Sequence, residues 1–109
     1  MMADRLTIED LDPATVAEGV ADGRFLLVDV REPSEYDAEH IEGALLFPLS
    51  TFDPAALPDP EGRAIVFQCA AGGRSARAAE AAIAGGIPAN RHLAGGIAAW
   101  KRAGLPTTR

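Results

Sequence analysis

Residues 65–84 constrain the fold of this chain more than any other segment, because three kinds of local structure follow one another there. Residues 65–67 form an apolar run typical of a strand that is buried on both faces. Cys69 and a loop with two consecutive glycines come next, followed by an alanine-rich stretch that favours a helix and ends at Gly85. The sequence therefore predicts a strand, a tight loop and a helix in direct succession, which is the repeating unit of parallel α/β sheets.

The rest of the chain continues this alternation, without a long linker or an internal repeat. Strands are expected at 6–8, 25–30, 44–47, 65–67 and 91–93, helices at 13–22, 33–39, 74–84 and 97–103, and a helical turn or loop at 50–57. This order predicts an α/β fold with an open, mostly parallel sheet flanked by helices on both faces. Ligands bind such sheets at the carboxyl ends of the strands, where Cys69 falls. His92 is expected at the surface or in a turn, and Trp100 as an anchor of the last helix in the core.

Length, composition and charge exclude several classes of protein. The 109 residues leave room for one hydrophobic core, so a single domain over residues 1–109 is expected. No apolar run approaches the roughly 20 residues that span a bilayer, and no secretory signal begins the chain, so we expect no membrane partner and a cytoplasmic location. The net charge of −6 argues against nucleic acid. One cysteine and two dispersed histidines match no metal-site spacing, so no metal or cofactor is expected.

Cys69 is the only cysteine and lies where the strand gives way to the loop. Gly72 and Gly73 allow successive backbone N–H groups to turn toward one point, and the following helix N-terminus adds partial positive charge there. A free thiol with a pKa near 8.5 is only about 3% ionised at pH 7, and such a site lowers that pKa. Arg74 stands at a helix start, where the macrodipole disfavours a cation, which also indicates anion binding. We therefore interpret Cys69 as a nucleophile rather than a small buried hydrophobic residue.

Three stretches of the chain resemble the rhodanese-like sulfurtransferase family, and together they cover nearly its whole length. Residues 69–75, Cys-Ala-Ala-Gly-Gly-Arg-Ser, are similar to the family's C-x-x-G-x-R-S loop. Residues 29–36 and 40–44 resemble its D-V-R-x-x-x-E-[YF] run and the H-I-x-G-A that follows. Residues 93–100 resemble its closing L-x-G-G-x-x-x-W. The resemblance implies a single-domain rhodanese-like fold.

The resemblance also implies an activity. The Cys69 thiolate would attack the outer sulfur of a donor such as thiosulfate, release sulfite and keep a persulfide, and a thiol, cyanide or a protein sulfur acceptor would then take the terminal sulfur. The residues expected to bind the substrate are Ala70, Ala71, Gly72, Gly73, Arg74, Ser75 and Arg77. For Arg77, one turn into the helix, a solvated or ion-paired arginine is the alternative.

The remaining polar residues near the loop are expected to be structural. Asp29 and Arg31 flank the end of a buried strand, which favours an internal ion pair or loop anchor near the site. The resemblance implies that His40 hydrogen-bonds the turn before Gly43. A general base at His40 that serves Cys69 is the less favoured alternative.

Two other classes of function stay open. A phosphatase or arsenate reductase of related fold would use the same thiolate, but its loop is C-x5-R, whereas Cys69 and Arg74 enclose only four residues. A non-catalytic interaction module of this fold commonly lacks the cysteine. Some thiosulfate-active members carry basic residues directly after the nucleophile, whereas Ala70 and Ala71 are neutral, so the pocket is expected to be less cationic.

Overall fold

The structure is a computed structural model that describes residues 7–109, and its centre is a parallel sheet of five strands in the order β1-β5-β4-β2-β3. The strands are β1 (Glu9–Leu11), β2 (Phe25–Asp29), β3 (Leu45–Leu46), β4 (Ala64–Gln68) and β5 (Arg91–Leu93). The helices are α1 (Pro13–Ala21), α2 (Pro33–Ala38), α3 (Gly73–Ala84) and α4 (Gly96–Arg102), with 3₁₀ turns η1 (Leu49–Thr51) and η2 (Pro54–Ala56). The predicted α/β architecture is confirmed, and each of the four strand pairings is parallel.

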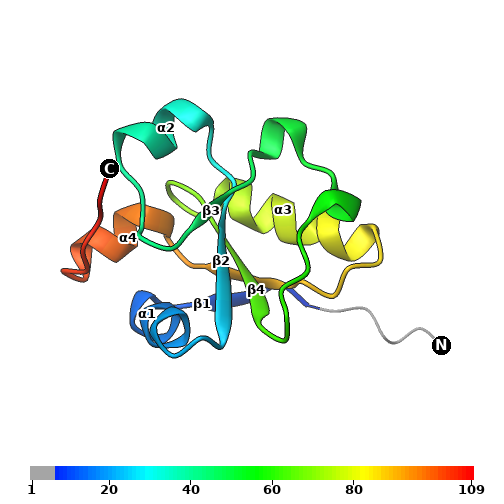
Figure 1. Ribbon diagram of the computed structural model, residues 1–109, viewed down its shortest axis with the longest axis horizontal. Coiled ribbons are helices and arrows are strands. Elements are labelled where there is room, and N and C mark those ends of the chain that lie inside the picture. The colour runs from blue at the N-terminus through cyan, green and yellow to red at the C-terminus, as the bar shows by residue number, and fades with distance from the viewer. Residues whose placement is uncertain (1–6) are drawn as a thin grey trace.

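The helices cover both faces of the sheet, with α1 and α4 on one side and α3 on the other (Figure 1). Alternate residues of a strand point to opposite faces, so β2 and β4 contribute side chains to both core layers. Leu27 and Val66 pack with residues of α1 and α4, among them Trp100, which is 5% exposed and anchors the last helix as predicted. Leu26 and Phe67 pack with the opposite layer. Burial on both faces explains why these strands are continuous apolar runs.

Helix α3 packs against the sheet through alanines. Ala78, Ala79 and Ala82 have no exposed surface, and they belong to the same core layer as the side chains of β4. Small side chains allow a helix to approach a sheet closely. The helix begins at Gly73, one residue before the expected start, because Gly72 caps it in the left-handed conformation, with φ of 110°.

The prediction of a first strand at 6–8 is wrong. Leu6 lies outside the described residues, and the strand β1 begins at Glu9. The pairing with β5 sets this register, since Asp10 lies opposite His92 and the Glu9 N–H donates to the Asn90 carbonyl at 2.7 Å. An edge strand has one unpaired side and tolerates charged residues, so an apolar pattern was a poor guide to its position.

The glycine pair between β5 and α4 brings the end of the sheet against the loop that follows β4. Gly95 and Gly96 have φ of 76° and 62°, which favours glycine at both positions. The N–H of Ile97 then donates to the Cys69 carbonyl at 2.9 Å, and the N–H of Ala98 donates to the Ala70 carbonyl at 3.1 Å. A side chain on Gly96 would collide with this backbone. The close approach is therefore what requires the second glycine.

Gly96→Ala should lower the free energy of unfolding by about 3 kcal/mol, because a left-handed backbone at alanine and a backbone collision add together. Gly104→Ala is the matched control, since Gly104 also has a positive φ, of 81°, but faces open space. The control should lose only about 1 kcal/mol. Urea denaturation measures both values. Equal losses in the two variants would contradict the close approach of α4 to the loop.

Candidate active site

Cys69 directly follows β4, the central strand, at the carboxyl end of the sheet. Its sulfur accepts the N–H of Gly72 at 3.0 Å and lies 3.5 Å from the Ser75 hydroxyl oxygen. Only 1% of the residue is exposed. Because the N-terminus of α4 already engages the carbonyls of Cys69 and Ala70, the loop can turn its N–H groups toward the sulfur. The sulfur therefore lies inside a ring of donors rather than at an open surface.

Two opposed effects act on the Cys69 thiol. Burial raises its pKa, because a thiolate is poorly solvated there. The hydroxyl and N–H of Ser75, and the N–H groups of Gly72 and Ala71, lower the pKa by hydrogen bonding to the charged form. The hydrogen bonds prevail, and the pKa of Cys69 is below its ordinary value. The loop thus favours the nucleophilic form of a sulfur that is otherwise buried.

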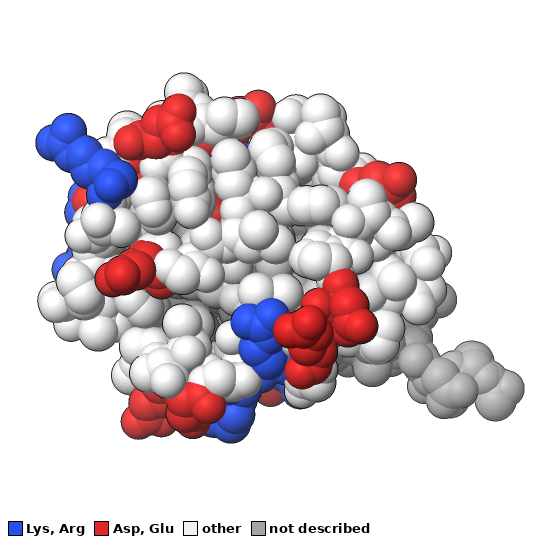
Figure 2. All heavy atoms as spheres, in the orientation of Figure 1, with Lys and Arg blue, Asp and Glu red and all other residues white. Residues whose placement is uncertain are grey.

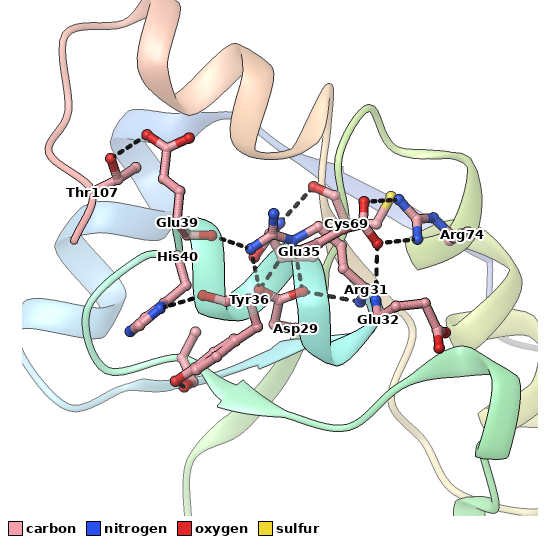
Figure 3. A network of polar contacts seen from close by, with 12 residues as sticks. Asp29, Arg31, Glu32, Glu35, Tyr36, Glu39, His40, Cys69, Arg74 and Thr107 are labelled. Carbon is pink, nitrogen blue, oxygen red and sulfur yellow. Dashed lines mark hydrogen bonds and ion pairs between the residues drawn. The ribbon is translucent and has the colours of Figure 1, made fainter. Parts of the chain in front are cut away.

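Arg74 is engaged by a carboxylate. Its two terminal nitrogens donate to Glu35 of α2 at 2.8 and 3.0 Å, which is a bidentate ion pair (Figure 3). The hydrogen bonds from Arg74 lower the pKa of Glu35 to about 2, and Glu35 raises the pKa of Arg74. The negative charge of the Cys69 thiolate raises the pKa of Arg74 further. Because Glu35 shares the arginine's charge, Arg74 offers an anion less positive charge than an unpaired guanidinium would.

A second, deeper ion pair holds α2 in place. Arg31 donates to both carboxylate oxygens of Asp29, at 2.8 to 3.2 Å, and both side chains are almost fully buried. Arg31 also donates to the Glu39 carbonyl at 2.7 Å, just beyond the end of α2 (Figure 3). The pair therefore ties the end of β2 to the helix that carries Glu35.

His40 does not bond the turn before Gly43, contrary to the expectation from the resemblance. Its ring nitrogen Nδ1 lies 2.8 Å from the Tyr36 carbonyl, and the ring stacks on Tyr36 with centroids 3.8 Å apart. The Tyr36 hydroxyl, in turn, donates to the Ala44 carbonyl, beyond that turn. The backbone of His40 pairs with Thr108, which brings the C-terminal segment beside α2 (Figure 1). The partners of His40 are thus structural, and none of them is Cys69.

His92 is buried, so the expectation that it lies at the surface or in a turn is wrong. The residue is in β5 and is 6% exposed. Its Nδ1 lies 2.8 Å from the Ser75 hydroxyl oxygen, and its Nε2 lies 2.7 Å from a carboxylate oxygen of Asp10 in β1. A polar residue within an inner strand beside β4 was the sequence signal that could have indicated this position.

The other residues predicted to bind substrate differ in exposure. Ala71, Gly73 and Arg77 are exposed, Ala70 is half-buried, and Ser75 is fully buried. Within residues 7–109, no three His, Cys, Asp or Glu side chains gather closely enough to hold a metal ion. None of the described helices has both the length and the apolar content needed to cross a membrane.

The central strand of the parallel sheet ends next to one cysteine, and the loop that follows surrounds the cysteine sulfur with hydrogen-bond donors. These two features define a class of α/β proteins whose site is a loop around a cysteine. A family model described as the rhodanese-like domain matches residues 12–103. The chain belongs to this family.

Individual relatives are similar over most of this chain. An uncharacterized protein of Synechocystis is 41% identical over 97 residues, which are 89% of this chain and 54% of that protein, so this chain spans about half of that relative. A sulfurtransferase of Allochromatium vinosum is 33% identical, over 91% of this chain and 94% of its own. A solved structure from Rhodopseudomonas palustris, of unknown function and described as a possible tyrosine phosphatase, is 32% identical, with a TM-score of 0.79 over 93% of this chain and 85% of its own.

Acid should weaken the protein partly through Glu35. Its pKa lies near 2 in the folded state, below the ordinary 4.5, so its pairing stabilises the fold above pH 4.5 and is lost as the pH falls toward 2. Glu35→Gln should therefore be less stable than wild type at neutral pH and should lose stability less steeply over that window. Urea denaturation at successive pH values measures the slopes. Glu42→Gln, at an exposed carboxylate, is the control and should keep the wild-type slope. The same slope in Glu35→Gln would contradict the pairing.

Proposed function

We propose that this protein is a sulfurtransferase that carries a sulfane sulfur on Cys69 as a persulfide. The observation that carries the proposal is the ring of hydrogen-bond donors around a single cysteine, with the Gly72 N–H at 3.0 Å from the sulfur and a pKa lowered by these donors. Membership of the rhodanese-like family and the similarity to a protein named sulfurtransferase support it.

The first half of the reaction forms the persulfide. The Cys69 thiolate attacks the outer sulfur of thiosulfate, the sulfur–sulfur bond of the donor breaks, and sulfite leaves with the electron pair. The charge balances, because a thiolate and a dianion become a persulfide anion and a sulfite dianion. In the second half, cyanide or a thiolate attacks the terminal sulfur, and Cys69 leaves as a thiolate. The products are thiocyanate or the persulfide of the acceptor.

The loop suits this chemistry because its donors are fixed before the reaction. A persulfide anion needs hydrogen bonds at a sulfur one bond farther out than the thiolate, and we expect the N–H groups of the loop from Ala70 to Ser75 to supply them. Little attraction comes from side-chain charge, since Glu35 pairs Arg74. On the face shown in Figure 2, acidic and basic side chains are scattered, and no patch of basic side chains gathers there. A donor anion would therefore be recognised by the loop itself, with the exposed Arg77 assisting at its outer end.

Thiosulfate should add the mass of one sulfur atom to the wild-type protein, and cyanide or dithiothreitol should remove it. Intact-mass measurement without reductant shows this directly, because Cys69 is the only cysteine. Cys69→Ser should take up none. Sulfur uptake by Cys69→Ser would mean that the nucleophile is wrongly assigned, and an unmodified wild type would exclude thiosulfate as the donor.

A phosphatase is the second candidate, because the similar Rhodopseudomonas palustris protein is described as a possible tyrosine phosphatase. The loop argues against it. Only four residues separate Cys69 from Arg74, and Cys69 is 1% exposed, so a single outer sulfur atom reaches the thiolate more easily than the central atom of a tetrahedral phosphate.

The wild type should accordingly show negligible hydrolysis of aryl phosphates and no arsenate reduction, under conditions in which it transfers sulfur. Release of the phenol, followed by absorbance, measures the first activity. Cys69→Ser sets the background. Cysteine-dependent hydrolysis as fast as sulfur transfer would favour the phosphatase over the sulfurtransferase.

A further inference from the structure

A continuous line of polar contacts runs from the buried sulfur to the surface. The Cys69 sulfur lies 3.5 Å from the Ser75 hydroxyl oxygen, which lies 2.8 Å from Nδ1 of His92. Nε2 of His92 lies 2.7 Å from Asp10. Ser75 is fully buried and the His92 side chain is 8% exposed, whereas 70% of the Asp10 side chain is exposed. Four separate elements supply these groups, and together they connect the sulfur to solvent.

We propose that Ser75, His92 and Asp10 form a proton relay that receives the proton of the Cys69 thiol. Ser75 contacts the reacting sulfur, while His92 and Asp10 are positioning residues that act through it. The proposal rests on the proposed function only in taking Cys69 as the nucleophile, because it concerns how the thiol ionises and not which donor it meets.

The donors and acceptors along the line are consistent with a neutral thiol. The Asp10 carboxylate can only accept, so Nε2 of His92 carries a proton and donates to it. In a neutral ring Nδ1 is then an acceptor, and the Ser75 hydroxyl donates to it. The hydroxyl oxygen is left to accept from the Cys69 thiol. Each proton on the line has one acceptor in this state.

The same four groups also accommodate a Cys69 thiolate, once two protons have each moved to the neighbouring group. The thiol proton passes to the Ser75 oxygen, and the former hydroxyl proton passes to Nδ1 of His92. The result is a thiolate that accepts from Ser75 and an imidazolium that donates to Ser75 and to Asp10. No bond other than those to hydrogen changes, and no electrons are gained or lost. The carboxylate of Asp10 stabilises the imidazolium, as in other acid–base sites built on histidine.

Ser75 couples the protonation of His92 to that of Cys69. Its hydroxyl also lies 3.2 Å from the Gly72 carbonyl, but it has one proton and can donate to only one of Gly72, His92 and Cys69 at a time. When Nδ1 of His92 becomes a donor, that proton is free to turn to the sulfur. The protonation of His92 therefore decides whether Ser75 supports a thiolate.

The other charged groups packed around the line are held in ion pairs or stand farther out. Arg74 is paired with Glu35, Arg31 with Asp29, and Arg91 with Glu9, and Arg102 of α4 approaches Gly95 beside the loop. These guanidinium groups stay charged throughout the neutral range. Changes in Cys69 reactivity near neutral pH are therefore expected to follow the relay.

The rate of alkylation of Cys69 by iodoacetamide, measured against pH, tests the relay without any sulfur donor. Cys69 is the only thiol, so the reaction reports one site. Ser75→Ala removes the link, and His92→Asn keeps an amide near Nδ1 that cannot take up a proton. Each variant should react about tenfold more slowly at pH 7, which corresponds to a thiol pKa higher by about one unit. His40→Asn is the matched control, because it removes the only other histidine, and it should react like the wild type.

If Ser75 and His92 act one after the other in the same relay, the losses of alkylation rate caused by their two substitutions should not add. The double variant Ser75→Ala/His92→Asn should be slowed no more than the slower single variant, whereas Ser75→Thr, which keeps a hydroxyl, should restore most of the rate. Multiplicative losses, or a rate–pH profile of His92→Asn that superimposes on the wild type, would overturn the proposal.

A second measurement leaves Ser75 and His92 intact and observes the His92 ring directly, first in the wild-type chain. The ¹⁵N chemical shifts of the His92 ring should change with the same midpoint as the alkylation rate, because one proton joins the two groups. In Cys69→Ala that shared midpoint should be lost. Identical His92 titrations with and without the thiol would overturn the relay. A wild type that passes both tests but takes up no sulfur from thiosulfate would retain the relay and refute that donor.

Discussion

The hydrogen bonds from the loop to the Cys69 sulfur are the interaction on which the rest of the site depends. Burying a thiolate is costly, since water no longer solvates the charge. The N–H groups of Ala71, Gly72 and Ser75 and the Ser75 hydroxyl replace that solvation, and the pKa of Cys69 falls below its usual value. The three N–H groups are part of the backbone turn, so they need not reorganise when charge develops on the sulfur, whereas the Ser75 hydroxyl turns toward it.

Much of the surrounding structure keeps this loop in its conformation. The N-terminus of α4 binds the carbonyls of Cys69 and Ala70, so these carbonyls cannot turn toward the sulfur. The pair of Glu35 and Arg74 joins α2 to the start of α3. Arg31 joins the end of α2 to the end of β2, because it donates to both the Glu39 carbonyl and Asp29. The ion pairs therefore hold the loop between two helices. In this account they act on sulfur chemistry through the position of the loop and not through a free positive charge.

The sequence predicted the features that depend on local pattern. Runs of apolar residues located the inner strands, and the glycines and alanines of 72–84 located the loop and its helix. Contacts that depend on the register of distant segments could not be predicted in this way. Asp10 and His92 are 82 residues apart and meet only because β1 pairs with β5 in one register, and Glu35 meets Arg74 across 39 residues. The position of β1 itself was missed for the same reason, because its place is set by pairing and not by hydrophobicity.

The ultraviolet absorbance of the thiolate, titrated against pH in the wild type with Cys69→Ser as the blank, shows whether the loop lowers the pKa of the buried thiol. The Ser75 hydroxyl and the backbone N–H groups of the loop should together outweigh burial and ionise the only cysteine of the chain. The thiolate should therefore appear at a pH below the ordinary thiol value of about 8.5. A thiolate that appears only at or above that pH would show that burial, and not the hydrogen bonds of the loop, determines the pKa of Cys69.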